Sequence, residues 1–184
     1  EIITGNSCLF LLNKEFYKTC PLKKDGGKVK EYVKSIEGGI FIYVGDIWDD
    51  SYDSLDIVKN IPITFNELIN KNNYIISIDQ IPVFPYSVPE KINDVRSQGF
   101  IGFEHTLWKQ QKDTKPKLKV YENYKSSYFS LIKPEEYICD NILENYCVGA
   151  INEYLYYRDD NHLTVDGFGL FLNQLINKIN EIKQ

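Results

Sequence analysis

The apolar residues of the chain fall into two kinds of pattern, short unbroken runs and longer runs with helical spacing. The short runs are rich in isoleucine and aromatic residues, and two of them stop at a proline. This is typical of strands that are covered on both faces of a parallel sheet. They predict strands at residues 2–4, 38–48, 73–82 and 128–134.

The longer runs predict helices over residues 28–36 and 54–71, and a final helix that starts after Thr164. Threonine is a favoured N-cap, and apolar residues from Phe168 to Ile182 recur with the period of a helix. Residues 84–127 are expected to form an excursion with one more helix. Strands that alternate with helices predict an α/β fold, a three-layer sandwich around a mostly parallel sheet.

Composition narrows the class of protein. The chain has 184 residues, of which 43% are hydrophobic and 26% charged, as expected for one globular domain over residues 1–184. The net charge is −5 and the lysines are spread along the chain, which argues against a nucleic-acid-binding surface. No run approaches the ~18 apolar residues of a membrane-spanning helix.

The four cysteines form two local pairs, Cys8 with Cys20 and Cys139 with Cys147. Neither pair has the spacing of a zinc site, and histidine is too scarce to complete one, so no metal or cofactor is indicated. Two disulfides in an oxidising compartment fit this pattern. Four buried thiols in a cytosolic protein remain the alternative.

The most informative polar cluster is Asp159-Asp160-Asn161-His162, directly before the final helix. An aspartate three residues before a histidine can accept a hydrogen bond from the imidazole Nδ1–H, which leaves Nε2 free to deprotonate a hydroxyl. The alternative is a polar helix start whose acidic residues favour the positive end of the helix. The other histidine, His105, has no Asp or Ser at a meaningful spacing and is expected at the surface or the edge of the core.

The stretch YYRDDNHLTVDGFG at 156–169 resembles the last conserved block of SGNH/GDSL hydrolases. It is most similar to the SGNH domain that is fused behind the membrane domain of acyltransferase-3 O-acetyltransferases, which modify bacterial surface polysaccharides. Other stretches resemble that branch in the same order: IFIYVGDIW, YIISIDQIPVFPYSVP, KPEEYICDNILENYC and the earlier cysteine pair.

The resemblance implies a flavodoxin-like sheet, His162 as general base, Asp159 as its orienting partner and a serine nucleophile. The only string comparable to the Gly-Asp-Ser block of the family is Gly5-Asn6-Ser7. In one alignment the segment EIIT is the first strand and Ser7 is the nucleophile. In the other, EIIT is the second strand and the nucleophile block lies upstream of residue 1.

The family also supplies a Gly and an Asn that stabilise the oxyanion. At the comparable strand end this chain has Gly45-Asp46-Ile47-Trp48, without an Asn. A backbone N–H such as that of Gly45 is therefore the expected donor. Trp48 is expected to line the sugar or acyl site, or to pack at the core edge.

What the resemblance implies as a whole is an extracytoplasmic acetyltransferase or esterase domain of a membrane-anchored protein, on the periplasmic side of a bacterial inner membrane. An integral-membrane acyltransferase domain would donate acetyl, and a polysaccharide such as lipopolysaccharide would accept it. The alternative is a non-catalytic module of the same fold that binds or positions a glycan.

Overall fold

In a computed structural model of the chain, the described residues are 10–12, 26–45, 47, 54–92, 97 and 99–184. Ser7, Cys8, Cys20 and Trp48, and the strand expected at 2–4, lie outside them. The chain divides into two units. The first unit consists of Glu1–Gln80 and Lys115–Leu131, and the second of Ile81–Thr114 and Ile132–Gln184.

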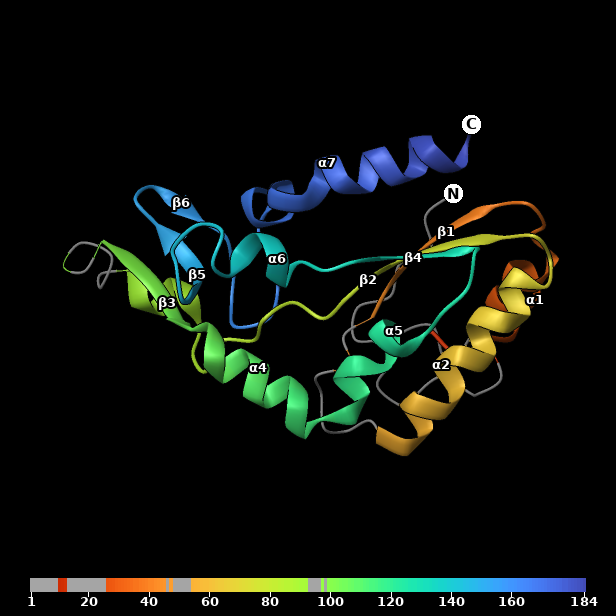
Figure 1. The fold of residues 1–184 in the computed structure, drawn as a ribbon, viewed down its shortest axis with the longest axis horizontal. Coiled ribbons are helices and arrows are strands. Elements are labelled where there is room, and N and C mark those ends of the chain that lie inside the picture. Colours follow the sequence, from red (N-terminus) through yellow and green to blue (C-terminus); the bar gives the residue numbers. More distant parts are fainter. Residues whose placement is uncertain (1–9, 13–25, 46, 48–53, 93–96, 98) are drawn as a thin grey trace. The chain divides into compact units, whose positions relative to one another are not determined.

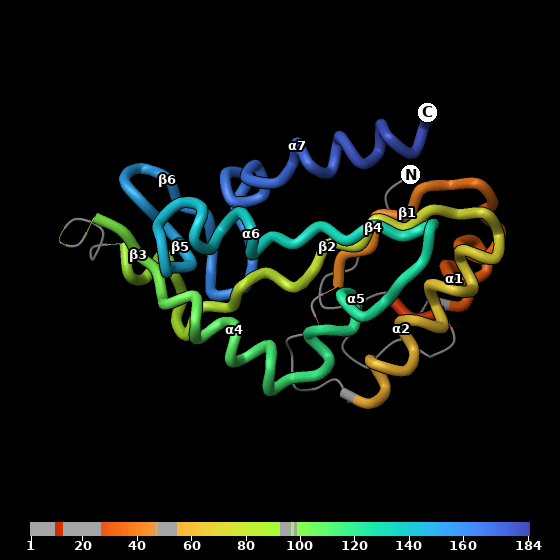
Figure 2. Tube along the Cα trace, viewed as in Figure 1, coloured from red at the N-terminus to blue at the C-terminus, as the bar shows by residue number. Residues whose placement is uncertain are grey.

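The sheet of the first unit contains three of the strands predicted from apolar runs. These are β1 (Ile40–Val44), β2 (Tyr74–Ile78) and β4 (Phe129–Ile132), in the order β1-β2-β4. Strands β1 and β2 are parallel, with Ile40 opposite Tyr74, and the traces of the three strands run beside one another (Figure 2). The parallel pairing is the arrangement that the unbroken apolar runs predicted.

Helices α1 (Gly26–Ser35), α2 (Ser54–Ile69) and α5 (Val120–Asn123) lie on one side of this sheet (Figure 1), and the 3₁₀ turn η3 (Pro116–Lys119) leads into α5. Helix α2 is a single helix with Pro62 inside it. Its Phe65 is fully buried and packs edge-on against Tyr43 of β1, with their ring centroids 5.0 Å apart. The aromatic residues of the chain therefore contribute directly to this core.

A buried asparagine connects the elements at the start of the sheet. Asn73, just before β2, has no exposed surface. Its side-chain oxygen accepts a hydrogen bond from the backbone N–H of Gly39, and its amide donates to the carbonyls of Ile36 and Leu68. One side chain thus satisfies backbone groups at the ends of α1 and α2 and ahead of β1.

The second unit has its own sheet of three strands, which the sequence patterns did not predict. Strands β3 (Phe100–Glu104), β5 (Tyr146–Ile151) and β6 (Tyr154–Leu155) pair antiparallel in the order β3-β5-β6. Each is short, and β3 carries a bulge at Gly102, where a Cβ would meet the backbone oxygen of Cys147 at 2.8 Å. The glycine and the short length hide the alternation that marks a strand.

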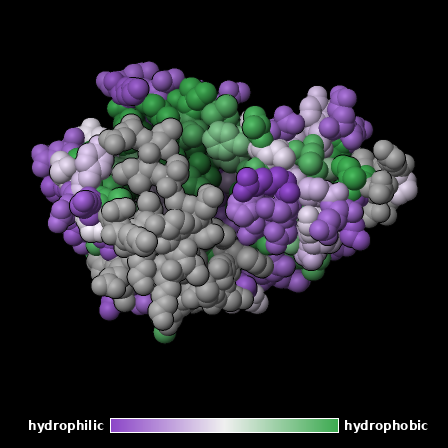
Figure 3. All heavy atoms as spheres, turned by 180° about the vertical axis from the view of Figure 1, so that it is seen from behind, coloured by the Kyte–Doolittle hydropathy of each residue, from purple (hydrophilic) through white to green (hydrophobic). Residues whose placement is uncertain are grey.

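The helical elements of the second unit are η2 (Val88–Lys91), α4 (His105–Thr114), α6 (Glu135–Ile138) and α7 (Val165–Ile182). Helix α4 lies in the excursion at 84–127, where one more helix was expected, although the short helix α5 lies there too, and α7 is the final helix. Within α7, Phe171 and Leu175 are buried, whereas Phe168 and Leu172 remain partly exposed and hydrophobic surface is visible where α7 runs at the top of Figure 3. No helix among the residues that the structure describes is long and apolar enough to span a membrane.

Candidate active site in the second unit

The candidate site is the loop that joins β6 to α7, and its geometry starts from the helix cap. Thr164 is the N-cap of α7, as predicted, and its hydroxyl oxygen accepts a hydrogen bond from the backbone N–H of Gly167 at 3.1 Å. The Thr164 hydroxyl itself donates to the carbonyl of Leu155. The cap therefore fixes where the loop 158–163 meets the helix.

Within this loop, the Asp159 carboxylate takes part in three hydrogen bonds, two with His162 and one with Asn161. Its Oδ1 accepts from the backbone N–H groups of Asn161 at 3.0 Å and His162 at 2.7 Å. Its Oδ2 lies 2.8 Å from Nδ1 of His162. An Nδ1–H that donates to Asp159 leaves the Nε2 lone pair free, and the His162 side chain is 53% exposed. The ring can thus accept a proton from a bound hydroxyl.

The electrostatics of the pair favour an ionised Asp159. Burial by itself would raise the pKa of Asp159. The hydrogen bonds from the backbone of Asn161 and His162, and from the His162 ring, outweigh it and hold the pKa below its ordinary value. Arg158 adds a distant cation, with its Nε 3.9 Å from Asp159 Oδ2. A carboxylate that stays charged can stabilise an imidazolium beside it.

The loop is anchored to the proline-rich segment that follows β2. The backbone N–H of Phe84 donates to the carbonyl of Asp160 at 2.9 Å, and that of Val88 donates to the carbonyl of Asp159 at 3.1 Å. The buried hydroxyl of Tyr157 donates to the carbonyl of Pro82 at 2.8 Å. The stretch IPVFPYSVP therefore serves to hold the backbone of the His–Asp loop in place.

Gly167, in the first turn of α7, shows how closely the loop packs on the helix. A Cβ at this position would lie 2.1 Å from the backbone oxygen of Tyr156 and 3.0 Å from a methyl carbon of Leu163. Only glycine permits this approach. The first of the two glycines in the family-like block is thus explained by packing.

Gly45, the expected oxyanion donor, lies in the first unit, is buried and directly follows β1. The backbone N–H of Ile47 donates to the side-chain oxygen of Gln80 at 3.0 Å, and both residues are buried. Gln80 follows β2, so its side chain connects the segments that leave two neighbouring parallel strands. Working residues of α/β sheets cluster at such ends. The sequence analysis did not single out this role of Gln80. Its position directly after an apolar run, where a parallel strand ends, is the sequence signal that could have indicated it.

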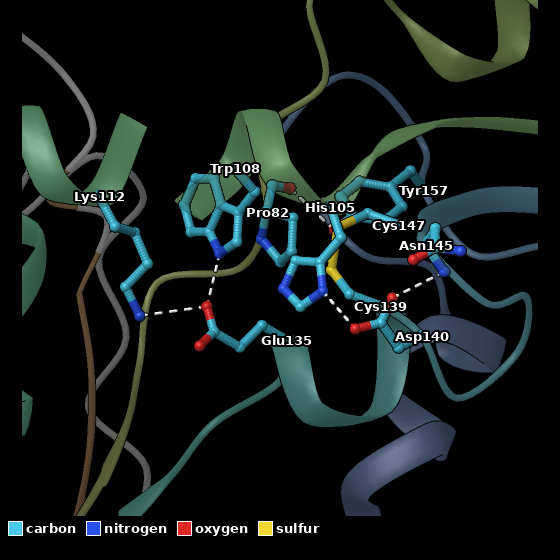
Figure 4. Close-up of a disulfide and its surroundings, with 10 residues drawn as sticks. All are labelled: Pro82, His105, Trp108, Lys112, Glu135, Cys139, Asp140, Asn145, Cys147 and Tyr157. Carbon is cyan, nitrogen blue, oxygen red and sulfur yellow. Dashed lines mark hydrogen bonds and ion pairs between the residues drawn. A yellow bond between two sulfur atoms is a disulfide. The ribbon is translucent and has the colours of Figure 1, made fainter. Parts of the chain in front are cut away.

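The other histidine, His105, lies beside the disulfide between Cys139 and Cys147 (Figure 4). Its Nδ1 is 2.6 Å from Asp140 Oδ2, and its Nε2 is buried without a hydrogen-bond partner. His105 is 9% exposed, at the core edge as predicted. The acidic partner was missed because it is 35 residues away along the chain and arrives only through the pairing of β3 with β5.

The residues around the disulfide have a structural role. His105, Cys139 and Cys147 form the group of potential metal ligands among the described residues, with ligand atoms within 4.8 Å of one another. Both sulfurs are bonded to each other, so they cannot act as thiolate ligands. Nearby, the Glu135 carboxylate accepts hydrogen bonds from Trp108 Nε1 and from Lys112 Nζ. The described cluster thus ties α4 to α6.

Comparisons with known proteins agree with this fold. A family model described as "SGNH domain (fused to AT3 domains)" matches residues 3–175. Among solved structures, the periplasmic domain of the lipopolysaccharide acetyltransferase of Salmonella ser. Paratyphi A is similar, with a TM-score of 0.62 and 14% sequence identity. The similarity covers 93% of this chain and 67% of that one. The comparison with curated proteins gave no significant match. The predicted α/β fold class is confirmed.

Proposed function

The chain belongs to the family of SGNH domains that are fused to AT3 domains, and on that premise we propose that it is an acetyltransferase or esterase domain acting on sugar hydroxyls of a bacterial surface polysaccharide. The observation that carries the proposal is the exposed His162 ring, held through Nδ1 at 2.8 Å from the Asp159 carboxylate. This is the arrangement that a general base for acyl transfer needs.

In the proposed mechanism, His162 Nε2 takes the proton of a serine hydroxyl while that oxygen attacks the acetyl carbonyl. The leaving group departs with the proton from the imidazolium, and an acetyl-serine remains. A sugar hydroxyl, or water in the esterase reaction, then gives its proton to His162 and attacks the acetyl-serine. The bond from the acetyl carbon to the serine oxygen breaks, and His162 returns the proton to that oxygen, which restores the serine hydroxyl. Asp159 keeps the imidazole in the correct tautomer throughout.

Ser7 is the proposed nucleophile, and the Gly45 backbone N–H the proposed oxyanion donor. Trp48 is the proposed lining of the sugar or acyl site. The partner in this scheme is an integral-membrane acyltransferase domain, which supplies the acetyl group, as fusion to AT3 domains in the family suggests. The chain would then act outside the cytoplasm, on the periplasmic side of the inner membrane.

Hydrolysis of p-nitrophenyl acetate tests the catalytic roles. We expect His162→Ala and Ser7→Ala to lower the rate by at least about 100-fold, since a positioned base and its nucleophile contribute roughly 10²–10⁴-fold. Asp159→Asn should lower it comparably, and the matched control Asp160→Asn should stay close to wild type, because the Asp160 side chain makes no contact with His162 in the hydrogen bonds described. An unchanged rate in His162→Ala would contradict the proposed enzyme activity. The alternative function, a non-catalytic module that binds a glycan, would then be favoured. Loss in His162→Ala but not in Ser7→Ala would move the nucleophile outside residues 1–184.

The proposed compartment has a separate test. The chain has four cysteines. If they form two disulfides, reduction of the denatured protein should raise its intact mass by four hydrogens. A gain of two hydrogens would leave only the Cys139–Cys147 bond and remove the proposed Cys8–Cys20 bond. Two disulfides are expected of a chain that folds in an oxidising compartment.

A further inference from the structure

One face of the β3-β5-β6 sheet carries a row of partly exposed apolar side chains. Phe100 of β3 is directly opposite Ile151 of β5, and Ile151 is directly opposite Tyr154 of β6. Directly opposed residues point to the same face of a sheet. The adjacent row, with Ile101 opposite Ala150, points to the other face and is buried. The row that ends at Tyr154 is therefore the outer face of this sheet.

The same face continues along the chain toward the candidate base. Side chains alternate along an extended segment, so Tyr154, Tyr156 and Arg158 share one side, and Tyr157 is on the other. Tyr157 and Leu163 form an antiparallel bridge, flanked by hydrogen bonds from Arg158 N–H to His162 and from Thr164 N–H to Tyr156. His162 is thus the cross-strand partner of Arg158, on the side away from Tyr157.

From this juxtaposition we infer that Tyr154 and Arg158 form a subsite for an uncharged sugar ring of the acceptor, next to His162. The inference rests on the proposed function and specifies which surface would hold its acceptor. Both side chains are available to a ligand, since Tyr154 is 50% exposed and the Arg158 side chain is 63% exposed.

The chemistry of these side chains suits a sugar. The next residue on the same side, Tyr156, is buried, and its ring lies nearly parallel to that of Tyr154, with centroids 6.4 Å apart and planes inclined by 6°. The exposed ring of Tyr154 is therefore a flat platform beside a buried one. Such a face packs against the C–H groups of a pyranose. The Arg158 guanidinium offers N–H donors in a planar fork for the hydroxyl oxygens, and its Nε lies a long 3.9 Å from Asp159 Oδ2.

The charges nearby select an uncharged ring. Arg158 is surrounded in sequence by acidic residues: Glu153, Asp159, Asp160 and Asp166. A sugar that carries a carboxylate or phosphate would meet more negative than positive charge at this surface. A neutral ring avoids that repulsion and still uses the arginine as a hydrogen-bond donor.

Saturation-transfer NMR with methyl glycosides as probes tests the inference. Methyl α-glucoside, α-galactoside, α-mannoside and α-rhamnoside are the neutral probes, and methyl α-glucuronide is the acidic one. We expect the wild type to transfer saturation to at least one neutral glycoside. Tyr154→Ala should lower that signal at least about fivefold, because it removes the aromatic ring on which the sugar packs. Arg158→Gln should lower the signal less, because it removes only some of the N–H donors. The matched control is Tyr32→Ala, a 43% exposed tyrosine on α1.

Two further variants guard against a folding artefact. Tyr154→Phe keeps the ring and should retain the signal, and Tyr154→Leu keeps apolar bulk without a ring and should lose it at an unchanged melting temperature. The inference is overturned if no neutral glycoside gives a signal, if Tyr154→Leu matches the wild type, or if the glucuronide gives the strongest signal. Because sugar binding needs no ester cleavage, sugar binding without hydrolysis would refute the proposed function alone. Hydrolysis without sugar binding would refute the subsite alone.

Discussion

At the scale of single residues, the candidate site depends on how one aspartate is used. Asp159 accepts two backbone hydrogen bonds through Oδ1 and the imidazole through Oδ2. Asp160 contributes its backbone carbonyl to the anchor at Phe84. The two neighbouring aspartates therefore have separate roles, and the three-residue spacing to His162 identifies the one that meets the ring. A carboxylate with several N–H donors remains charged, as its lowered pKa reflects.

Gly167 provides a residue-scale prediction, because Gly169 in the same helix is a matched control. Gly167→Ala should destabilise the protein by about 1–3 kcal/mol, since its Cβ would collide with the backbone oxygen of Tyr156. Gly169→Ala has open space at its Cβ and should stabilise α7 by up to about 1 kcal/mol. Urea denaturation of both variants measures the difference. Equal free energies of unfolding would contradict the close packing of the loop on the helix.

At the scale of elements, the disulfide segment is a small hydrogen-bonded unit built on β5. Cys139 and Cys147 are bridge partners as well as disulfide partners. The Asp140 carboxylate closes the segment between them, because its Oδ1 accepts from the backbone N–H of Asn145 and its Oδ2 meets His105. The hydrogen bond with His105 is the main reason that the pKa of Asp140 lies below its ordinary value.

This lowered pKa predicts how stability depends on pH. A carboxyl whose pKa is lower in the folded state stabilises the protein above its unfolded pKa of about 3.9. That stabilisation is lost as the pH falls through the folded-state pKa. The melting temperature of the wild type should therefore fall more steeply below about pH 4 than that of Asp140→Asn. The control Glu144→Gln removes an exposed carboxylate from the same segment and should follow the wild type. Parallel curves for the wild type and Asp140→Asn would contradict the role of this carboxylate.

Asn73 provides a second element-scale prediction, in the first unit. Asn73→Ala leaves the Gly39 N–H and the carbonyls of Ile36 and Leu68 without their partner. Each buried group left unpaired costs about 1–3 kcal/mol, so the loss should exceed about 2 kcal/mol. The exposed Asn70 at the end of α2 is the control, and Asn70→Ala should change stability by less than about 0.5 kcal/mol. Chemical denaturation that finds the two variants equally stable would show that Asn73 is not the connection described.

At the scale of the whole molecule, the proposed chemistry uses side chains and backbone alone. Among the described residues, the potential metal ligands that gather together include two sulfurs already joined in a disulfide. Hydrolysis of p-nitrophenyl acetate should therefore be unchanged, within about twofold, after dialysis against EDTA. A loss of rate that added Zn²⁺ restores would contradict a mechanism based on serine, histidine and aspartate and would point to a metal-activated water instead.

Sequence patterns predicted the parallel strands and the final helix because both are local. A strand covered on both faces must be apolar throughout, as in β2, and a long amphipathic helix repeats its pattern over many turns. Strand β1 has the same apolar composition, but the expectation that it is covered on both faces was wrong, because Ile42 and Val44 are exposed. The antiparallel sheet of the second unit was missed because β3 and β5 are short, and because Gly102 and Gly149 interrupt their patterns. Both glycines are explained only by neighbours from distant parts of the chain.

The sequence by itself determined the α/β class, the family, the cap at Thr164 and the pairing of His162 with Asp159. Each of these rests on residues that are close in the chain or on a pattern that repeats locally. Only the tertiary structure decided that Asp140 meets His105 and that the proline-rich segment anchors the His–Asp loop. These contacts depend on strand pairing and close packing, which join positions that no spacing along the chain connects.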